Sequence, residues 1–276
     1  MARSQIAGPR RVAQGEFRKS SWAAALEPLS KGYTADPANP GYWFYDGLRI
    51  QAQLETHQFT VAYARTHWAA KTEVLDVAAG QGALAKQLLD SGFRVSCTSW
   101  NDACRLPVPL YRLDLDHPFG PADVGGRRFP LVCCIEIIEH VENPAAFLRS
   151  CESLLEDDGR LVLSTPNIES AVARLQWLLR GAPRVFSGDE VRHNRHISML
   201  WREGLEFLIE QAGLRVCEKH LLGGFPLPPS LRSTMRRLMY KGMCRFLPGE
   251  PRGTTRLYVL ARSAAGPRPH GADEVW

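Results

Sequence analysis

Short apolar runs alternate with helical segments along most of this chain, and the alternation constrains its fold more than any other feature. The expected strands cover residues 74–77, 94–99, 110–115, 131–135, 160–164, 214–218 and 255–261. Helical stretches between them lie at 83–90, 144–155 and 205–211. Strands that alternate with helices predict a parallel or mostly parallel sheet with helices on both faces. We therefore expect an α/β fold with a seven-stranded sheet.

The remaining residues divide into smaller units. We expect a mobile leader at 1–20, which is polar and Arg-rich. Aromatic residues and helical spacing predict an N-terminal helical cap at 21–70. The α/β domain would then occupy 71–262, with a disordered tail at 263–276. Two insertions are expected within the domain, at 168–195 and 225–254.

Composition excludes several classes of protein. Lys and Arg number 34 against 29 Asp and Glu, and the resulting charge of +5 requires no polyanionic partner. The seven cysteines form no C-x-x-C pair, so we expect buried reduced thiols rather than zinc sites or disulfides. There is no apolar signal region near the start and no run of 18 apolar residues. A cytoplasmic protein is expected.

The stretch VLDVAAGQGALAKQLLDSG, residues 74–92, predicts a ligand loop. A strand passes into a turn of small residues and then into a helix, whose free N–H groups face any ligand held there. Gly80, Gly82 and Ala85 also match a dinucleotide-type G-x-G-x-x-A pattern. However, the carboxylate of Asp76 precedes the turn, where it would attract a cation and repel a pyrophosphate.

This stretch resembles the first motif of class I S-adenosylmethionine-dependent methyltransferases. FPLVCCIEIIEHVENPAAFLRSCESLLEDDGRLVLSTPN is similar to the fourth-to-fifth-strand region of the same family. The relatives that it most resembles include ubiquinone-biosynthesis O-methyltransferases and many bacterial enzymes of unassigned substrate. The resemblance covers 72–218 and the final strand. It implies a Rossmann-like sheet and S-adenosylmethionine, rather than NAD, as cofactor.

The resemblance also implies roles for particular residues. The methionine end of the cofactor would be lined by Asp76, Ala78, Gly80 and Gly82. Asp114 would accept a hydrogen bond from the adenine amino group, beside the backbone of Leu115. Ile135 and Glu136 would lie under the sulfonium.

Two positions depart from the family pattern. Ala78 stands where the family has its first Gly, and we expect its φ to be negative. Ser99 stands where an acidic residue usually holds the ribose hydroxyls, and Trp100 follows where an apolar residue often covers the adenine. Asn101 or Asp102 would replace the missing carboxylate.

The polar set Glu136, Glu139 and His140 is expected at the carboxyl edge of the sheet, where ligands bind in open α/β folds. The three side chains could cap local turns, or they could position and deprotonate the acceptor. A third alternative is a divalent metal site completed by His193 or His196, as the resemblance to small-RNA and ubiquinone-type methyltransferases implies. We assign catalysis to the first three residues, assign no metal, and expect turnover to survive EDTA.

The two insertions allow both structural and functional interpretations. Residues 168–185 form either a packed helix or a lid over the substrate. Residues 230–246 combine an apolar stripe with five cationic residues: Arg232, Arg236, Arg237, Lys241 and Arg245. Such a helix either docks on its own domain or contacts an anionic membrane, and nucleic acid is not expected.

The sequence therefore predicts an S-adenosylmethionine-dependent methyltransferase that acts on a hydroxyl of a small-molecule or lipid-like acceptor. The first alternative is a methyltransferase of RNA or another polyanion. The second is a methyltransferase-like binding module without turnover, which the departure at Ser99 keeps open.

Overall fold

We describe a computed structural model of the chain. It describes residues 22–39, 41–182, 185–224, 231–264 and 266. The expected leader at 1–20 and most of the expected tail at 263–276 lie outside the described residues.

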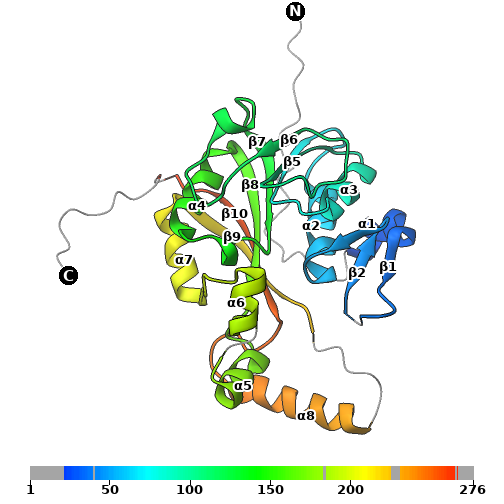
Figure 1. Cartoon of the computed structure of the whole chain (residues 1–276), viewed down its shortest axis with the longest axis vertical. Helices are drawn as coiled ribbons and strands as arrows, with labels where there is room; N and C mark the ends of the chain where they lie inside the picture. Colours follow the sequence, from blue (N-terminus) through cyan, green and yellow to red (C-terminus); the bar gives the residue numbers. More distant parts are fainter. Residues whose placement is uncertain (1–21, 40, 183–184, 225–230, 265, 267–276) are drawn as a thin grey trace, which may run out of the picture.

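A seven-stranded sheet forms the centre of the molecule (Figure 1). Every neighbouring pair is parallel except those of β10, which runs antiparallel to both β8 and β9. The order across the sheet is β6 (Leu110–Arg112), β5 (Arg94–Ser99), β4 (Glu73–Val77), β7 (Phe129–Ile135), β8 (Leu155–Pro166), β10 (Thr255–Arg262) and β9 (Leu214–Leu222). The Rossmann-like α/β fold expected from the sequence is confirmed.

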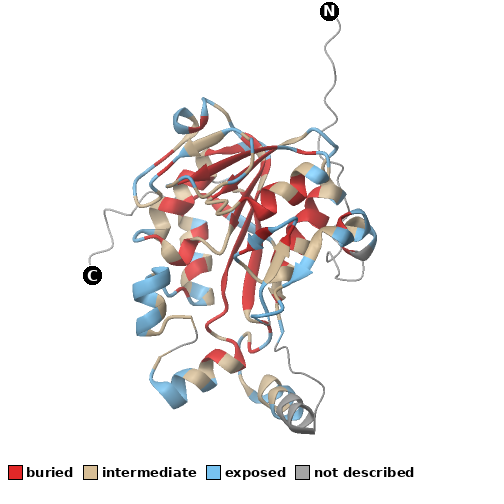
Figure 2. Cartoon of the chain, turned by 45° about the vertical axis from the view of Figure 1, so that its right-hand side comes forward, coloured by how far each residue is buried: buried red, intermediate tan, exposed pale blue. Residues whose placement is uncertain are grey.

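Helices cover both faces of this sheet, and side chains alternate between two cores as the pleat requires. On β7, Leu131 and Cys133 join the core beneath one pair of helices, α2 (Leu54–His67) and α3 (Ala83–Asp90). Val132 and Cys134 join the core beneath the opposite pair, α4 (Pro144–Ser153) and α7 (Arg202–Gln211). Figure 2 shows the resulting band of buried strands between half-buried helices.

The N-terminal segment contains a small sheet in addition to the expected helices. Its helices are α1 (Trp22–Leu26), the 3-10 helix η2 (Glu27–Gly32) and α2. Its antiparallel strands are β1 (Tyr33–Ala35), β2 (Trp43–Tyr45) and β3 (Leu48–Ile50). Asp46 and Gly47 have φ of 49° and 74°, as a two-residue hairpin turn requires. The Asp-Gly pair was the available sequence signal for this hairpin.

Further helices lie in the connections between strands. The 3-10 helix η3 (Pro121–Val124) leads into the amino end of β7, and η4 (Ile138–His140), α5 (Ala171–Arg180), α6 (Gly188–Asn194) and α8 (Leu231–Phe246) lie in the connections at the carboxyl edge of the sheet. Helices α5 and α8 pack against each other and project away from the sheet (Figure 1). We call this pair the α5–α8 arm. Within the described ranges, no helix has the length and hydropathy needed to cross a bilayer.

Candidate functional site

The turn between β4 and α3 brings backbone close to its neighbours. Gly80 and Gly82 have φ of 54° and 93°, which side chains rarely allow. A Cβ on Gly80 would lie 2.0 Å from Oε1 of Gln51, and one on Gly82 would lie 2.8 Å from Cδ1 of Leu106. The positive φ values favour glycine at both positions, and the turn forms a small-residue cradle at the start of α3.

Ala78 differs from the expectation, because its φ is +58° rather than negative. The left-handed conformation costs an alanine about 1–2 kcal/mol. Thr98 stabilises the turn, since its hydroxyl accepts a hydrogen bond from Ala78 N at 3.0 Å and its carbonyl accepts one from Ala79 N at 3.1 Å. Thr98 thus holds Ala78 in a backbone conformation that glycine adopts more readily.

Asp76 is a buried carboxyl group of this site. Only 3% of the residue is exposed, and its Oδ2 has no hydrogen-bond partner among the described residues. Burial raises the pKa of its carboxyl to about 8, nearby Cys104 adds to the rise, and a hydrogen bond from the Ala85 N–H opposes it. A buried carboxylate with one unpartnered oxygen fits a cationic ligand, such as the ammonium of a methionine moiety.

The adenosine side of the candidate site carries no buried carboxylate among the residues assigned to it. Ser99 is buried at the end of β5, and its hydroxyl donates to Oδ1 of Asn101 at 3.2 Å. The same Asn101 oxygen accepts from the Ala103 N–H at 3.1 Å, which orders the loop. Asp102 is exposed and pairs with Arg112.

The two residues expected beside the adenine are accessible. Trp100 is 78% exposed, which leaves its indole face available for stacking. Asp114, two residues after β6, is exposed, and its Oδ2 lies 3.0 Å from Nδ1 of His117. Leu115, next in the chain, is half-buried and packs at the border of the second core.

Glu136 follows Ile135, the half-buried last residue of β7, at the carboxyl edge of the sheet. Its φ of 49° is strained for a residue with a side chain, and such strain concentrates at functional sites. Ser164 fixes it twice, donating to Oε1 at 2.8 Å and accepting from the Glu136 N–H at 3.0 Å. Burial raises the pKa of this carboxyl to about 7, against the hydrogen bond from Ser164.

Glu139 lies deeper, with 1% of its surface exposed. Its Oε2 accepts from the Thr165 hydroxyl at 3.1 Å, while Oε1 has no hydrogen-bond partner in the described part of the chain. Burial, and then the charge of Glu136, raise the pKa of Glu139 well above its usual value. The sequence analysis did not name Ser164 or Thr165 as site residues. Their position at the carboxyl end of the expected strand 160–164 was the feature that could have indicated them.

Two histidines complete a cluster with Glu139. Ligand-capable atoms of Glu139, His140 and His196 all lie within 4.8 Å of one another. His193 is instead exposed, with Nδ1 2.9 Å from the Asp189 carbonyl. Burial, and then the charge of His196, lower the pKa of His140 to about 4, so its imidazole is neutral at pH 7. One carboxylate and two imidazoles form a donor set that suits a divalent metal.

Backbone carbonyls orient both imidazoles. Nδ1 of His140 lies 2.6 Å from the Asn194 oxygen, and Nδ1 of His196 lies 2.6 Å from the Val185 oxygen. A hydrogen on Nδ1 leaves Nε2 as the lone-pair nitrogen, the usual arrangement of metal-ligating histidines. Val185 and Arg195 have φ of 63° and 54°, so strained backbone flanks this cluster too.

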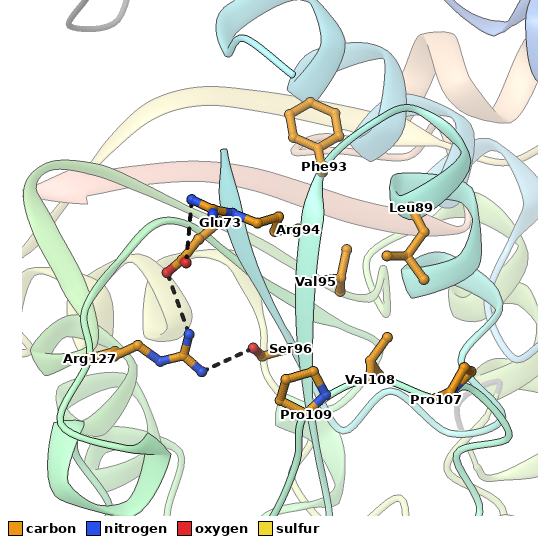
Figure 3. Close-up of a pocket in the computed structure, with 10 residues that line it drawn as sticks. All are labelled: Glu73, Leu89, Phe93, Arg94, Val95, Ser96, Pro107, Val108, Pro109 and Arg127. Atoms are coloured by element: carbon orange, nitrogen blue, oxygen red, sulfur yellow. Dashed lines mark hydrogen bonds and ion pairs between the residues drawn. The ribbon is translucent and has the colours of Figure 1, made fainter. Parts of the chain in front are cut away.

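Two surface pockets lie away from the glycine turn and from Glu136, Glu139 and His140. One of about 320 Å³ opens at the amino ends of β4 and β5, on the opposite edge of the sheet from the glycine turn (Figure 3). Its polar wall is an ion-pair network in which Arg94 and Arg127 both contact Glu73 at 3.6 Å. Such mutually paired charges form a structural contact rather than a catalytic arrangement.

The chain matches a known family over most of its length. A family model for a methyltransferase domain matches residues 16–219. A ubiquinone biosynthesis O-methyltransferase of Cereibacter sphaeroides is 29% identical over 126 residues, covering 40% of this chain and 50% of that protein. Another from Dinoroseobacter shibae is 29% identical over 165 residues, covering 53% and 61%. The chain thus spans half to three fifths of these relatives.

One solved structure shares the fold at a TM-score of 0.50. A chain of the complex between the Haloferax volcanii Trm112 methyltransferase activator and a methyltransferase has a TM-score of 0.50 at 14% identity, covering 76% of this chain and 91% of that one. A magnesium protoporphyrin IX methyltransferase from Synechocystis PCC 6803 with bound SAH has a TM-score of 0.48 at 15% identity, covering 75% and 83%.

Proposed function

The chain belongs to the S-adenosylmethionine-dependent methyltransferase family, and from that premise we propose that it methylates a hydroxyl of a small, lipid-like acceptor. The observation that carries the proposal is the placement of two carboxyl groups at one edge of the sheet. Asp76 is the penultimate residue of β4, and Glu136 directly follows the neighbouring strand β7. Oδ2 of Asp76 has no partner among the described residues and can meet a cation, whereas Ser164 orients Glu136 to accept a proton.

When bound, S-adenosylmethionine supplies a methyl group activated by a positively charged sulfur. The residues of the chain then have two tasks. Asp76 and the N–H groups at the start of α3 would hold the amino-acid end of the cofactor in the Gly80–Gly82 turn. Trp100 and Asp114 would contact the adenine, and Ile135 would contact the methyl-donor end.

Glu136 is the proposed base for the acceptor hydroxyl. With a pKa of about 7, a substantial fraction of its carboxyl is ionised at neutral pH, and it accepts the hydroxyl proton on Oε1 or Oε2. Ser164 fixes the rotamer of Glu136, so the proton acceptor is already oriented. Glu139 and His140 are the further residues that we propose position the acceptor, His140 directly and the buried Glu139 through its neighbours. Alignment of the nucleophile supplies much of the rate in such a transfer.

The relatives' names support the class of acceptor. Both cited relatives are O-methyltransferases of ubiquinone biosynthesis, which favours a phenolic or catechol hydroxyl on a molecule with an apolar tail. The test is a radiolabelled methyl-transfer assay with catechols that carry short and long alkyl chains. We expect transfer to rise with chain length and to fall at least a hundredfold in Glu136→Gln. Equal transfer by this variant would remove Glu136 as the base.

The exposed side chains of the α5–α8 arm support contact of the protein with an anionic membrane, from which a lipid-like acceptor would reach the site. Leu178 and Leu179 of α5 are 82% and 73% exposed. On α8, Leu238 and Phe246 are exposed beside the exposed Lys241. Apolar side chains interleaved with cations are typical of surfaces that bind anionic bilayers, where each cation contributes about 1 kcal/mol.

We expect the protein to sediment with anionic vesicles at low salt and not with neutral ones. Reversing Arg236, Arg237 and Lys241 to Glu should abolish sedimentation and leave cofactor affinity unchanged. The matched control reverses three exposed cations near the amino ends of strands: Lys71, Arg128 and Arg215. Wild-type protein that stays in the supernatant would favour an acceptor delivered from solution.

A second candidate is a metal-assisted version of the same reaction, and the cluster of Glu139, His140 and His196 favours it. A divalent cation there would satisfy the unpartnered Oε1 of Glu139 and would lower the pKa of a bound acceptor hydroxyl. The first candidate predicts turnover that survives EDTA. The second predicts a complete loss that Mg²⁺ or Mn²⁺ reverses.

Metal binding can also be measured without substrate. A cation at a hundred times its Kd stabilises the folded state by about 2.7 kcal/mol, which should raise Tm by several degrees. The second candidate expects this shift in wild type and in His193→Ala, but not in His196→Ala. A wild-type Tm that Mn²⁺ leaves unchanged would exclude it.

A further inference from the structure

Cys104 lies over the glycine turn, in the loop between β5 and β6. A Cβ on Gly82 would be 3.4 Å from its sulfur. Cys97, on β5, is the register partner of Asp76 on β4 and is fully buried. Cys104 packs on the same hydrophobic cluster that contains Cys97. Two thiols therefore adjoin the unpartnered carboxyl oxygen and the glycine cradle.

The two thiols differ in acidity. The Cys97 thiol donates a hydrogen bond to Cys104 and thereby lowers the pKa of Cys104 to about 6, although partial burial opposes the shift and the Leu106 N–H assists it. The same hydrogen bond, together with burial, raises the pKa of Cys97. At neutral pH Cys104 is the thiolate and the nucleophile, and Cys97 is the protonated partner.

We propose that Cys104 and Cys97 form an oxidisable pair whose disulfide closes the cofactor site. A hydroperoxide is the oxidant. The Cys104 thiolate attacks one peroxide oxygen, the O–O bond breaks, and a sulfenic acid and hydroxide form. The Cys97 sulfur then attacks the Cys104 sulfur, the S–S bond forms, and the sulfenic oxygen leaves as water with the Cys97 proton. With hydrogen peroxide, two thiols are oxidised by two electrons and two waters result.

Closure follows from where the loop is attached. In the reduced protein only noncovalent contacts hold Cys104 and Leu106 against Gly82, so the loop can move aside for a ligand. A bond to Cys97 would tie the loop to β5, directly beside Asp76. The methionine end of the cofactor would then be excluded. This inference rests on the proposed role of Asp76 and the Gly80–Gly82 turn.

The test treats the full reduced chain with hydrogen peroxide and measures the disulfides by peptide mapping and the S-adenosylmethionine Kd by calorimetry. We expect a Cys97–Cys104 linked peptide, a Kd at least tenfold weaker, and full recovery with dithiothreitol. Cys97→Ala should form no such link and, when reduced, should bind the cofactor as wild type does. Cys217→Ala, which removes an exposed thiol, should behave as wild type throughout.

Either of two results would overturn the inference. One is oxidation that consumes Cys217 and leaves Cys104 reduced; the other is linked protein whose Kd stays within twofold of the reduced value. Reduced wild type that binds no cofactor would instead contradict the proposed cofactor site. The peptide map would still decide whether the pair forms, so the two failures are distinguishable.

Discussion

Replacing Asp76 by Asn should weaken S-adenosylmethionine binding by about 30- to 1,000-fold. The substitution keeps the shape of the side chain and removes the charge that faces the ligand's ammonium. Loss of one partner from a buried charge pair costs about 2–4 kcal/mol of binding free energy, which converts to that factor in Kd. Calorimetry measures it directly. Asp158→Asn, at an exposed carboxylate, is the matched control and should leave Kd unchanged.

The pH dependence of Kd gives an independent test of the same residue. The carboxyl of Asp76 has a pKa of about 8 in the ligand-free protein, so it is mostly protonated at pH 6. Binding of a cation requires the ionised form, so affinity should rise as pH increases from 6 toward 8, by up to about tenfold per unit. Above pH 8 the ligand's own ammonium loses its proton and the rise should end. In Asp76→Asn the rising limb should disappear.

Replacing Arg256 by Met should destabilise the fold by about 3–5 kcal/mol. The guanidinium is fully buried; its Nε donates to Oε2 of Glu250 at 2.8 Å and its Nη2 contacts Asn167 and Glu169. These partners flank both insertions, so one cation holds the base of the α5–α8 arm to the sheet. Removing it leaves two carboxylates poorly compensated, which is far costlier than losing a surface pair.

Urea denaturation checks this prediction. Arg112→Met is the matched control, because the Arg112–Asp102 pair is 63% and 78% exposed and should contribute at most about 1 kcal/mol. If Arg256→Met unfolds within 1 kcal/mol of wild type, the buried network does not anchor the arm.

The sequence predicted those parts of the fold whose signals are local and periodic. The apolar run of β7 is buried on both faces, so its composition alone indicated a central strand. The small-residue turn after the Asp76 strand indicated a ligand loop at the carboxyl edge, because the turn directly follows the end of a strand. The antiparallel pairing of β10 and the order of the strands depend on contacts between residues far apart in the sequence. The local pattern of apolar residues could therefore not predict either feature.

Other features depended on tertiary contacts. The left-handed Ala78 is held by Thr98, twenty residues away, and propensity alone argues against it. The choice of His196 over His193 depends on the path of the loop after α6. The oxidisable pair was hidden because Cys97 and Cys104 do not share a recognised spacing motif, and only the loop between β5 and β6 brings them together.

The central claim is that the Asp76–Gly82 loop binds S-adenosylmethionine, and a calorimetric titration of the reduced protein tests it most directly. We expect a Kd in the micromolar range for S-adenosylmethionine or its demethylated product and no heat of binding with NAD. Tight NAD binding without S-adenosylmethionine binding would contradict the account.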